Sequence, residues 1–183
     1  MKQIIAGLIA AGILSIVVLL LFMGEDDTTP EDILEEHDIE GEAVETQVEH
    51  FEKTPLDFDE VVASVDGERL RIETAADFMK IPLEDKFYLS FAPYIDDTHP
   101  CTIHNLTTCR AELDEETFDV RITNENGVIF EDTLTTHENG FKGVWLERDI
   151  EATLHIIHGD LEVSREIETY QDSPTCITDI QLT

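Results

Sequence analysis

Basic residues are scarce in this sequence. Only 11 Lys and Arg stand against 42 Asp and Glu among 183 residues, which gives a formal charge of −31. Such a surface repels phosphate groups, which argues against nucleic-acid binding and against attachment to anionic lipids through basic patches. The acidic excess instead suits a protein that stays soluble in concentrated salt, where self-repulsion is screened. It predicts a salt-adapted source.

Cysteine is also rare, with three residues in the chain. An odd number cannot pair completely within one molecule, so at least one thiol is left over. The spacing is neither the Cys-x-x-Cys of thioredoxin-like proteins nor the four-ligand pattern of structural zinc sites. The sequence also lacks a recognisable Ser/His/Asp arrangement and a phosphate-binding glycine loop. We therefore expect no turnover of a substrate.

One long hydrophobic run is present at the N-terminus, "IIAGLIAAGILSIVVLLLFMG" from Ile4 to Gly24. It is long enough to cross a bilayer as a helix. Lys2 precedes the run and acids follow it, which places everything after Gly24 outside the cytoplasm. We expect residues 1–24 to form an uncleaved transmembrane anchor; the alternative is a signal sequence whose cleavage releases a secreted or periplasmic protein. Either way the rest lies where disulfides are permitted.

Residues 25–29 form an acidic spacer, and a helical region is predicted over residues 30–65. In "TTPEDILEEH", Thr29 is a suitable helix cap, and Pro30 suits the first helical position. A second helix is predicted from an apolar stripe at i, i+4 and i+7: Val44, Val48 and Phe51. The stretch "LDFDEVVASV" suggests a third, short helix.

The pattern changes to short alternating segments from residue 66 onward. Apolar residues alternate with polar ones in "FYLSFA" and "FDVRI", and Asn126-Gly127 is a strong hairpin signal between two such segments. Strands at roughly ten-residue spacing indicate a compact antiparallel β domain over residues 66–183. The predicted fold class is therefore α+β, with a small helical region first and the β domain second.

The stretch "HPCTIHNLTTC", residues 99–109, holds two of the three cysteines and two of the seven histidines. It lies in a long connection between the strands predicted at 87–92 and 117–123, and connections of that length are usually functional or disordered. One interpretation is a disulfide loop with uninvolved histidines. The other is a metal site, and the residues alone favour neither strongly.

The chemistry of the donors points to copper. Cu(I) prefers thiolate and thioether ligands, and imidazole also suits copper. Cys101 and Cys109 supply two sulfur atoms, His104 follows Cys101 in a Cys-x-x-His spacing, and Cys176 is close enough only if the sheet brings it there. His99 is a weaker candidate, because it precedes a proline and is expected to face solvent. Free thiols also reduce Cu(II) and form a disulfide as they do so.

Three segments resemble the CueP family of copper-binding periplasmic proteins: "FYLSFAPYIDDTHPCTIHNLTTCRAEL", "NGFKGVWLERDIEATL" and the closing "PTCITDIQLT". The resemblance extends from about Glu31 to the C-terminus and includes all three cysteines. It implies a protein that binds, buffers and delivers copper outside the cytoplasm, most simply as Cu(I). The implied ligands are Cys101, Cys109, Cys176 and His104.

The resemblance also implies a homodimer held by the helical region and a client protein that receives the copper. Two alternatives remain open from the residues. One is a cell-surface interaction module whose cysteines form a structural disulfide and bind no metal. The other is a thiol-dependent Cu(II) reductase.

Overall fold

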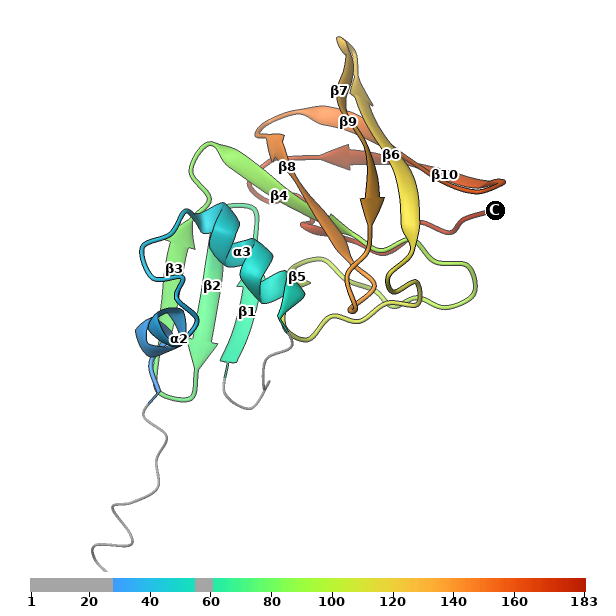
Figure 1. Ribbon diagram of the computed structural model, residues 1–183. Helices are drawn as coiled ribbons and strands as arrows, with labels where there is room; N and C mark the ends of the chain where they lie inside the picture. Colours follow the sequence, from blue (N-terminus) through green and yellow to red (C-terminus); the bar gives the residue numbers. More distant parts are fainter. Residues whose placement is uncertain (1–27, 55–60) are drawn as a thin grey trace, which may run out of the picture.

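A computed structural model describes residues 28–54 and 61–183 (Figure 1). The predicted anchor, residues 1–24, and most of the acidic spacer lie outside the described residues. No helix within the described ranges has the length and apolar content needed to cross a bilayer. The described part contains mostly antiparallel β-structure with two short helices, which agrees with the predicted α+β class.

The first helix, α2 (Pro30–Glu36), begins where the sequence predicts. The Thr29 side chain accepts a hydrogen bond from the backbone N–H of Asp32, and the Asp32 carboxylate accepts one from the Thr29 backbone. This reciprocal capping satisfies two backbone donors that a helix start otherwise leaves unpaired. Ile33 and Leu34 are buried on the face that packs against the first sheet.

The second helix, α3 (Val44–Lys53), lies beside a four-stranded sheet in the order β3-β2-β1-β5 (Figure 1). The predicted stripe of Val44, Val48 and Phe51 is buried in the core that the two helices share with this sheet. The strands are β1 (Val61–Val65), β2 (Arg69–Thr74), β3 (Phe78–Pro82) and β5 (His104–Asn105).

The prediction of a third helix ending at residue 65 is wrong for its described part, because Val61–Val65 is strand β1. The side chains of Val61, Ala63 and Val65 alternate into the core, which is the period of a strand rather than a helix. β1 pairs with β2 on one side and with β5 on the other, so long-range pairing fixes its conformation. Residues 55–60 lie outside the described residues.

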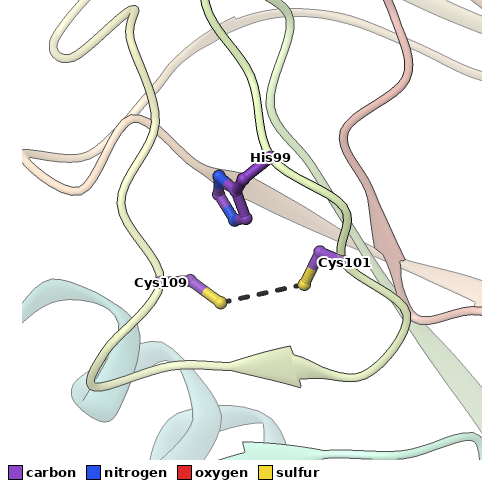
Figure 2. Close-up of side chains that lie close together, drawn as sticks. All are labelled: His99, Cys101 and Cys109. Atoms are coloured by element: carbon purple, nitrogen blue, oxygen red, sulfur yellow. Dashed lines mark hydrogen bonds between the residues drawn. The ribbon is translucent and has the colours of Figure 1, made fainter.

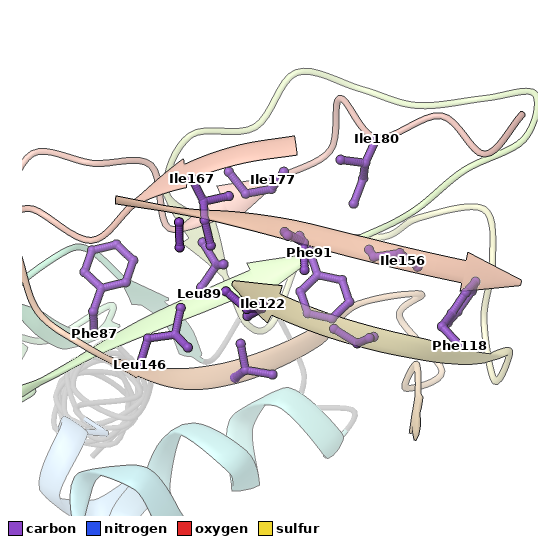
Figure 3. Close-up of a cluster of buried hydrophobic side chains, with 14 of the residues drawn as sticks. Phe87, Leu89, Phe91, Phe118, Ile122, Leu146, Ile156, Ile167, Ile177 and Ile180 are labelled. Atoms are coloured by element: carbon purple, nitrogen blue, oxygen red, sulfur yellow. The ribbon is translucent and has the colours of Figure 1, made fainter. Parts of the chain in front are cut away.

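A second four-stranded sheet has the order β10-β9-β6-β7. The predicted Asn126-Gly127 turn joins β6 and β7, and Gly127 has a φ of 119° that suits glycine. One face of this sheet contributes to a large apolar core, of which Figure 3 shows part. Its strands are β6 (Thr117–Asn124), β7 (Gly127–Thr135), β9 (Glu151–His158) and β10 (Leu161–Glu168).

A third sheet, in the order β11-β4-β8, separates the two cores. Its strands are β4 (Lys86–Phe91), β8 (Lys142–Glu147) and the short β11 (Cys176–Ile177). Alternate residues of β4 enter different cores: Phe87 and Leu89 pack in the large core, whereas Tyr88 packs with the helices. β11 runs parallel to β4, so the β region is not wholly antiparallel as predicted. This parallel pairing brings Cys176 to the junction of the two cores.

Candidate metal centre

The predicted long connection runs from the end of β4 to the start of β6 and is held in place along its length. β5 lies within it and pairs with β1, and the backbone N–H of Leu106 donates to the carbonyl of Ala63. The Glu112 carboxylate accepts backbone hydrogen bonds from Ile95, Asp96 and Asp97. The ligand-rich stretch is therefore an ordered loop, tied at both sides.

All three sulfur atoms come together beside this loop, which contains Cys101 and Cys109, whereas Cys176 belongs to β11. Cys101 and Cys176 form a disulfide across 75 residues of sequence, with a Cα–Cα distance of 5.5 Å. Cys109 is a free, half-buried thiol whose Sγ lies 3.9 Å from that of Cys101 (Figure 2). The predicted approach of Cys176 to the loop is therefore present. In the structure, however, two of the three sulfur atoms are bonded to each other.

His104 lies beside the sulfur of Cys176 and is fully buried. Its Nδ1 is 3.7 Å from the Sγ of Cys176, and its ring stacks near that of Phe141 at a centroid distance of 4.7 Å. Its backbone N–H donates to the hydroxyl of Thr175, the residue before Cys176. Within the described residues, the possible donor atoms of His104, Cys109 and Cys176 all lie within 4.8 Å of one another.

His99 belongs to a second, more exposed group. Within the described ranges, its imidazole and the sulfur atoms of Cys101 and Cys109 also lie within 4.8 Å of one another (Figure 2). All three residues are half-buried. The expectation that His99 faces solvent is therefore only partly correct, since its ring lies beside two cysteines. Cys109 is common to both groups.

The other nitrogen of His104 contacts a buried carboxylate. Its Nε2 lies 2.8 Å from Oε2 of Glu52, and Glu52 also accepts hydrogen bonds from the hydroxyl of Tyr88 at 3.1 Å and the side-chain amide of Asn139 at 2.9 Å. Burial disfavours the imidazolium, but the carboxylate of Glu52 and the nearby sulfur of Cys109 outweigh it and raise the pKa of His104 to about 9. Burial opposes ionisation of Glu52 too, yet its partners hold its pKa below the usual range.

Sequence reasoning missed Glu52, although a signal for it is present. Val44, Val48 and Glu52 follow one another at intervals of four, so Glu52 continues the buried face of α3. A charged residue on a buried helical face needs a partner, because an unpaired buried charge is costly. That partner, His104, lies 52 residues away in sequence and no local pattern identifies it.

Two or three sulfur atoms with one or two imidazoles are the donor set of soft-metal-binding proteins. The geometry and the donor chemistry therefore fit this class of protein, and the candidate site lies at a small apolar cluster that includes Phe141 and Cys176. Copper fits the set better than calcium or magnesium, which prefer oxygen ligands. Three thiolate ligands require the Cys101–Cys176 disulfide to be reduced first.

The chain belongs to the CueP family: residues 43–181 match the family described as "Periplasmic copper-binding protein CueP". It is also similar to a solved structure described as the crystal structure of S.CueP, with 36% sequence identity and a TM-score of 0.80. That similarity covers 85% of this chain and 98% of the other. The comparison with curated proteins gives no match. The family assignment supports copper as the metal.

Proposed function

We propose that this protein buffers and delivers copper outside the cytoplasm, binding Cu(I) through the thiolates of Cys101, Cys109 and Cys176 together with Nδ1 of His104. Binding, rather than turnover, is the function. The observation that carries the proposal is the convergence of these donors from separate parts of the chain. The Cys176 segment reaches the Cys101 loop because β11 pairs with β4 and because the backbone N–H groups of Thr175 and Cys176 donate to the carbonyl of Thr102.

The burial of the donors supports Cu(I) over harder cations. His104 and Cys176 are buried, and Phe141 packs against them in a small apolar cluster. A soft monovalent ion bound by thiolates is compatible with such surroundings, whereas a hydrated divalent ion loses its water shell there at a large cost. Release then occurs by exchange of ligands with a client protein at the more exposed side, where His99 and Cys109 lie.

The test is a competitive titration of the reduced, full-length protein with Cu(I) and a chromogenic chelator in the absence of oxygen. We expect Cys101→Ser and Cys109→Ser to lower the Cu(I) affinity by orders of magnitude while circular dichroism stays unchanged. His158→Ala is the matched control. His158 lies on β9, away from the candidate site, and bonds to the carbonyl of Thr117 on β6 of the same sheet. If both cysteine variants bind copper like the parent protein, the assignment of the site fails.

A second function is favoured by the disulfide itself. The thiols of Cys101 and Cys176 can give up two electrons and two protons as they form the observed bond, reducing two Cu(II) to Cu(I). Cys109 then remains as a thiol beside the newly formed Cu(I). A thiol-dependent Cu(II) reductase predicts two Cu(I) per disulfide formed, measured by chelator absorbance and by thiol counting. A structural disulfide without metal function predicts neither signal.

We also propose the membrane anchor at residues 1–24 and a homodimer formed through the helices of the region 30–65. The division of the chain into this region and a copper-binding domain at 66–183 is likewise a proposal, with the difference that residues 61–65 form strand β1 of the adjoining sheet. Sequence pattern and resemblance support these features. Membrane fractionation of the full-length protein tests the anchor. Sedimentation analysis in detergent tests the dimer, and disulfide trapping with Cys109 in the cell identifies a client.

A further inference from the structure

Among the described residues, Glu52 is the only buried carboxylate. It contacts the ring of His104, whose other nitrogen lies near the sulfur of Cys176. The Glu52 side chain is 1% exposed, and four segments fix its position. It projects from α3 and accepts hydrogen bonds from Tyr88 on β4, from Asn139 in the turn before β8 and from His104 on β5. Both carboxylate oxygens are engaged, so the group has little freedom to move.

This arrangement determines which nitrogen of His104 faces the sulfur atoms. With the carboxylate at Nε2, that nitrogen carries a hydrogen and donates it, so Nδ1 is the nitrogen whose lone pair becomes available to a metal once the ring gives up its second proton. Nδ1 is the atom that lies 3.7 Å from the Sγ of Cys176. Histidines that bind metals usually donate their other N–H to a carboxylate or carbonyl, which fixes the tautomer and the ring orientation.

We propose that Glu52 is a positioning residue for copper, holding the His104 ring so that Nδ1, and not Nε2, completes the sulfur site. The inference rests on the proposed function, since it presumes that the cysteines bind Cu(I). It goes beyond that function by assigning a role to a residue that does not touch the metal. It also explains why a helix of the first core bears a carboxylate at a buried position.

A purely structural role for Glu52 is the competing explanation, and two substitutions separate the two roles. In Glu52→Gln, an amide oxygen at the Oε1 position still accepts from His104 and Asn139. The amide nitrogen then takes the place of Oε2, where it donates to the Tyr88 oxygen but faces the N–H of His104. The ring therefore keeps one of its two acceptor contacts without the charge. In Glu52→Leu, the volume is similar but His104 loses its partner. Tyr88→Phe is the matched control, because it removes one buried hydrogen bond to Glu52 and leaves the contact with His104 in place.

The experiment uses the reduced, full-length protein loaded with Cu(I). X-ray absorption gives the number of nitrogen and sulfur ligands, and ¹⁵N NMR identifies the bound nitrogen of His104, since Cu(I) is diamagnetic. We expect one nitrogen ligand, Nδ1, in the parent protein, Glu52→Gln and Tyr88→Phe. We expect its loss in Glu52→Leu, together with an affinity for Cu(I) lower by about 10–100-fold.

Three results overturn the inference. The first is a folded Glu52→Leu protein that retains the nitrogen ligand. The second is a parent protein in which Nε2 binds the metal; this measurement needs no variant, so it holds even if Glu52→Leu does not fold. The third is a parent protein in which only sulfur binds Cu(I), which removes His104 from the ligand set and leaves copper binding by the three cysteines standing. A parent protein that binds no Cu(I) instead removes the proposed function, and the inference with it.

Discussion

The Sγ of Cys109 lies 3.9 Å from the Sγ of Cys101, although Cys101 is already bonded to another cysteine. A free thiol therefore sits in contact with a disulfide, and the three sulfur atoms form one cluster. Which of them are reduced decides how many are available to a metal.

Alkylation of the oxidised protein should modify Cys109 and neither of the other cysteines. Cys109 is half-buried and unbonded, whereas Cys101 and Cys176 are joined to each other. Peptide mapping by mass spectrometry after treatment with iodoacetamide measures this directly. Reduction in denaturant should make all three residues reactive, because Cys176 is buried in the folded protein. Labelling of Cys101 or Cys176 without reduction contradicts the observed pairing.

Reduction of the Cys101–Cys176 disulfide should lower the free energy of unfolding by about 2–5 kcal/mol, because the bond closes a long loop in the unfolded chain. Urea denaturation with and without a phosphine reductant measures the difference. The Cys109→Ser protein should show the same difference. The Cys101→Ser/Cys109→Ser double variant leaves no pair to bond and should be insensitive to the reductant. A sensitive double variant would refute this assignment.

The Gly143→Ala substitution should destabilise the protein by about 1–3 kcal/mol through overpacking. A Cβ at position 143 on β8 would overlap the hydroxyl and ring of Tyr88, which is buried and bonded to Glu52. In a Tyr88→Leu background the space is vacated, so the two losses measured by urea denaturation should be less than additive. Simple additivity would show that Tyr88 is not the residue that excludes a side chain there.

The turn held by Glu112 should loosen in acid. Backbone N–H groups of Ile95, Asp97 and Asp96 hold the pKa of Glu112 below its usual 4.5. A lowered pKa in the folded state means that the stabilisation is present above pH 4.5 and is lost as the pH falls through the lower folded value. Hydrogen exchange, corrected for intrinsic rates, should show falling protection of residues 95–97 in that window.

The Glu112→Gln protein is the control for this pH dependence. Its amide is neutral at every pH and accepts hydrogen bonds less strongly than a carboxylate. Protection of residues 95–97 should therefore be lower at neutral pH and should not fall further through the titration of a side chain at position 112. Protection that stays unchanged in the parent protein as the pH falls from 4.5 until the carboxylate is fully protonated would mean that this carboxylate does not hold the turn.

Local signals in the sequence predicted several elements correctly. Thr29 and Pro30 mark the start of α2, the stripe through Val48 predicts α3, and Asn126-Gly127 predicts the hairpin of β6 and β7. Each depends on residues close together in the chain. The helix predicted to end at residue 65 failed because the neighbours of β1, namely β2 and β5, lie outside that window.

The site was predictable in its ligand types but not in its connections. The clustering of cysteine and histidine within residues 99–109 is visible in the sequence, and so is the chemistry they suit. The bond between Cys101 and Cys176 depends on the parallel pairing of β11 with β4, two strands that are far apart in the sequence. The contact between Glu52 and His104 joins the first core to the loop. Such partners are selected by the packing of distant segments, and no short pattern encodes them.

The position of Cys109 in both ligand groups bears on the proposed exchange of ligands with a client protein. One group contains His99 and Cys101 near the surface, and the other contains His104 and Cys176 in the interior. In the proposed function all three sulfur atoms bind one ion, so Cys109 is the ligand that links the half-buried His99 to the buried His104. A client protein that approaches from the side of His99 would then meet the thiol of Cys109 before the buried donors.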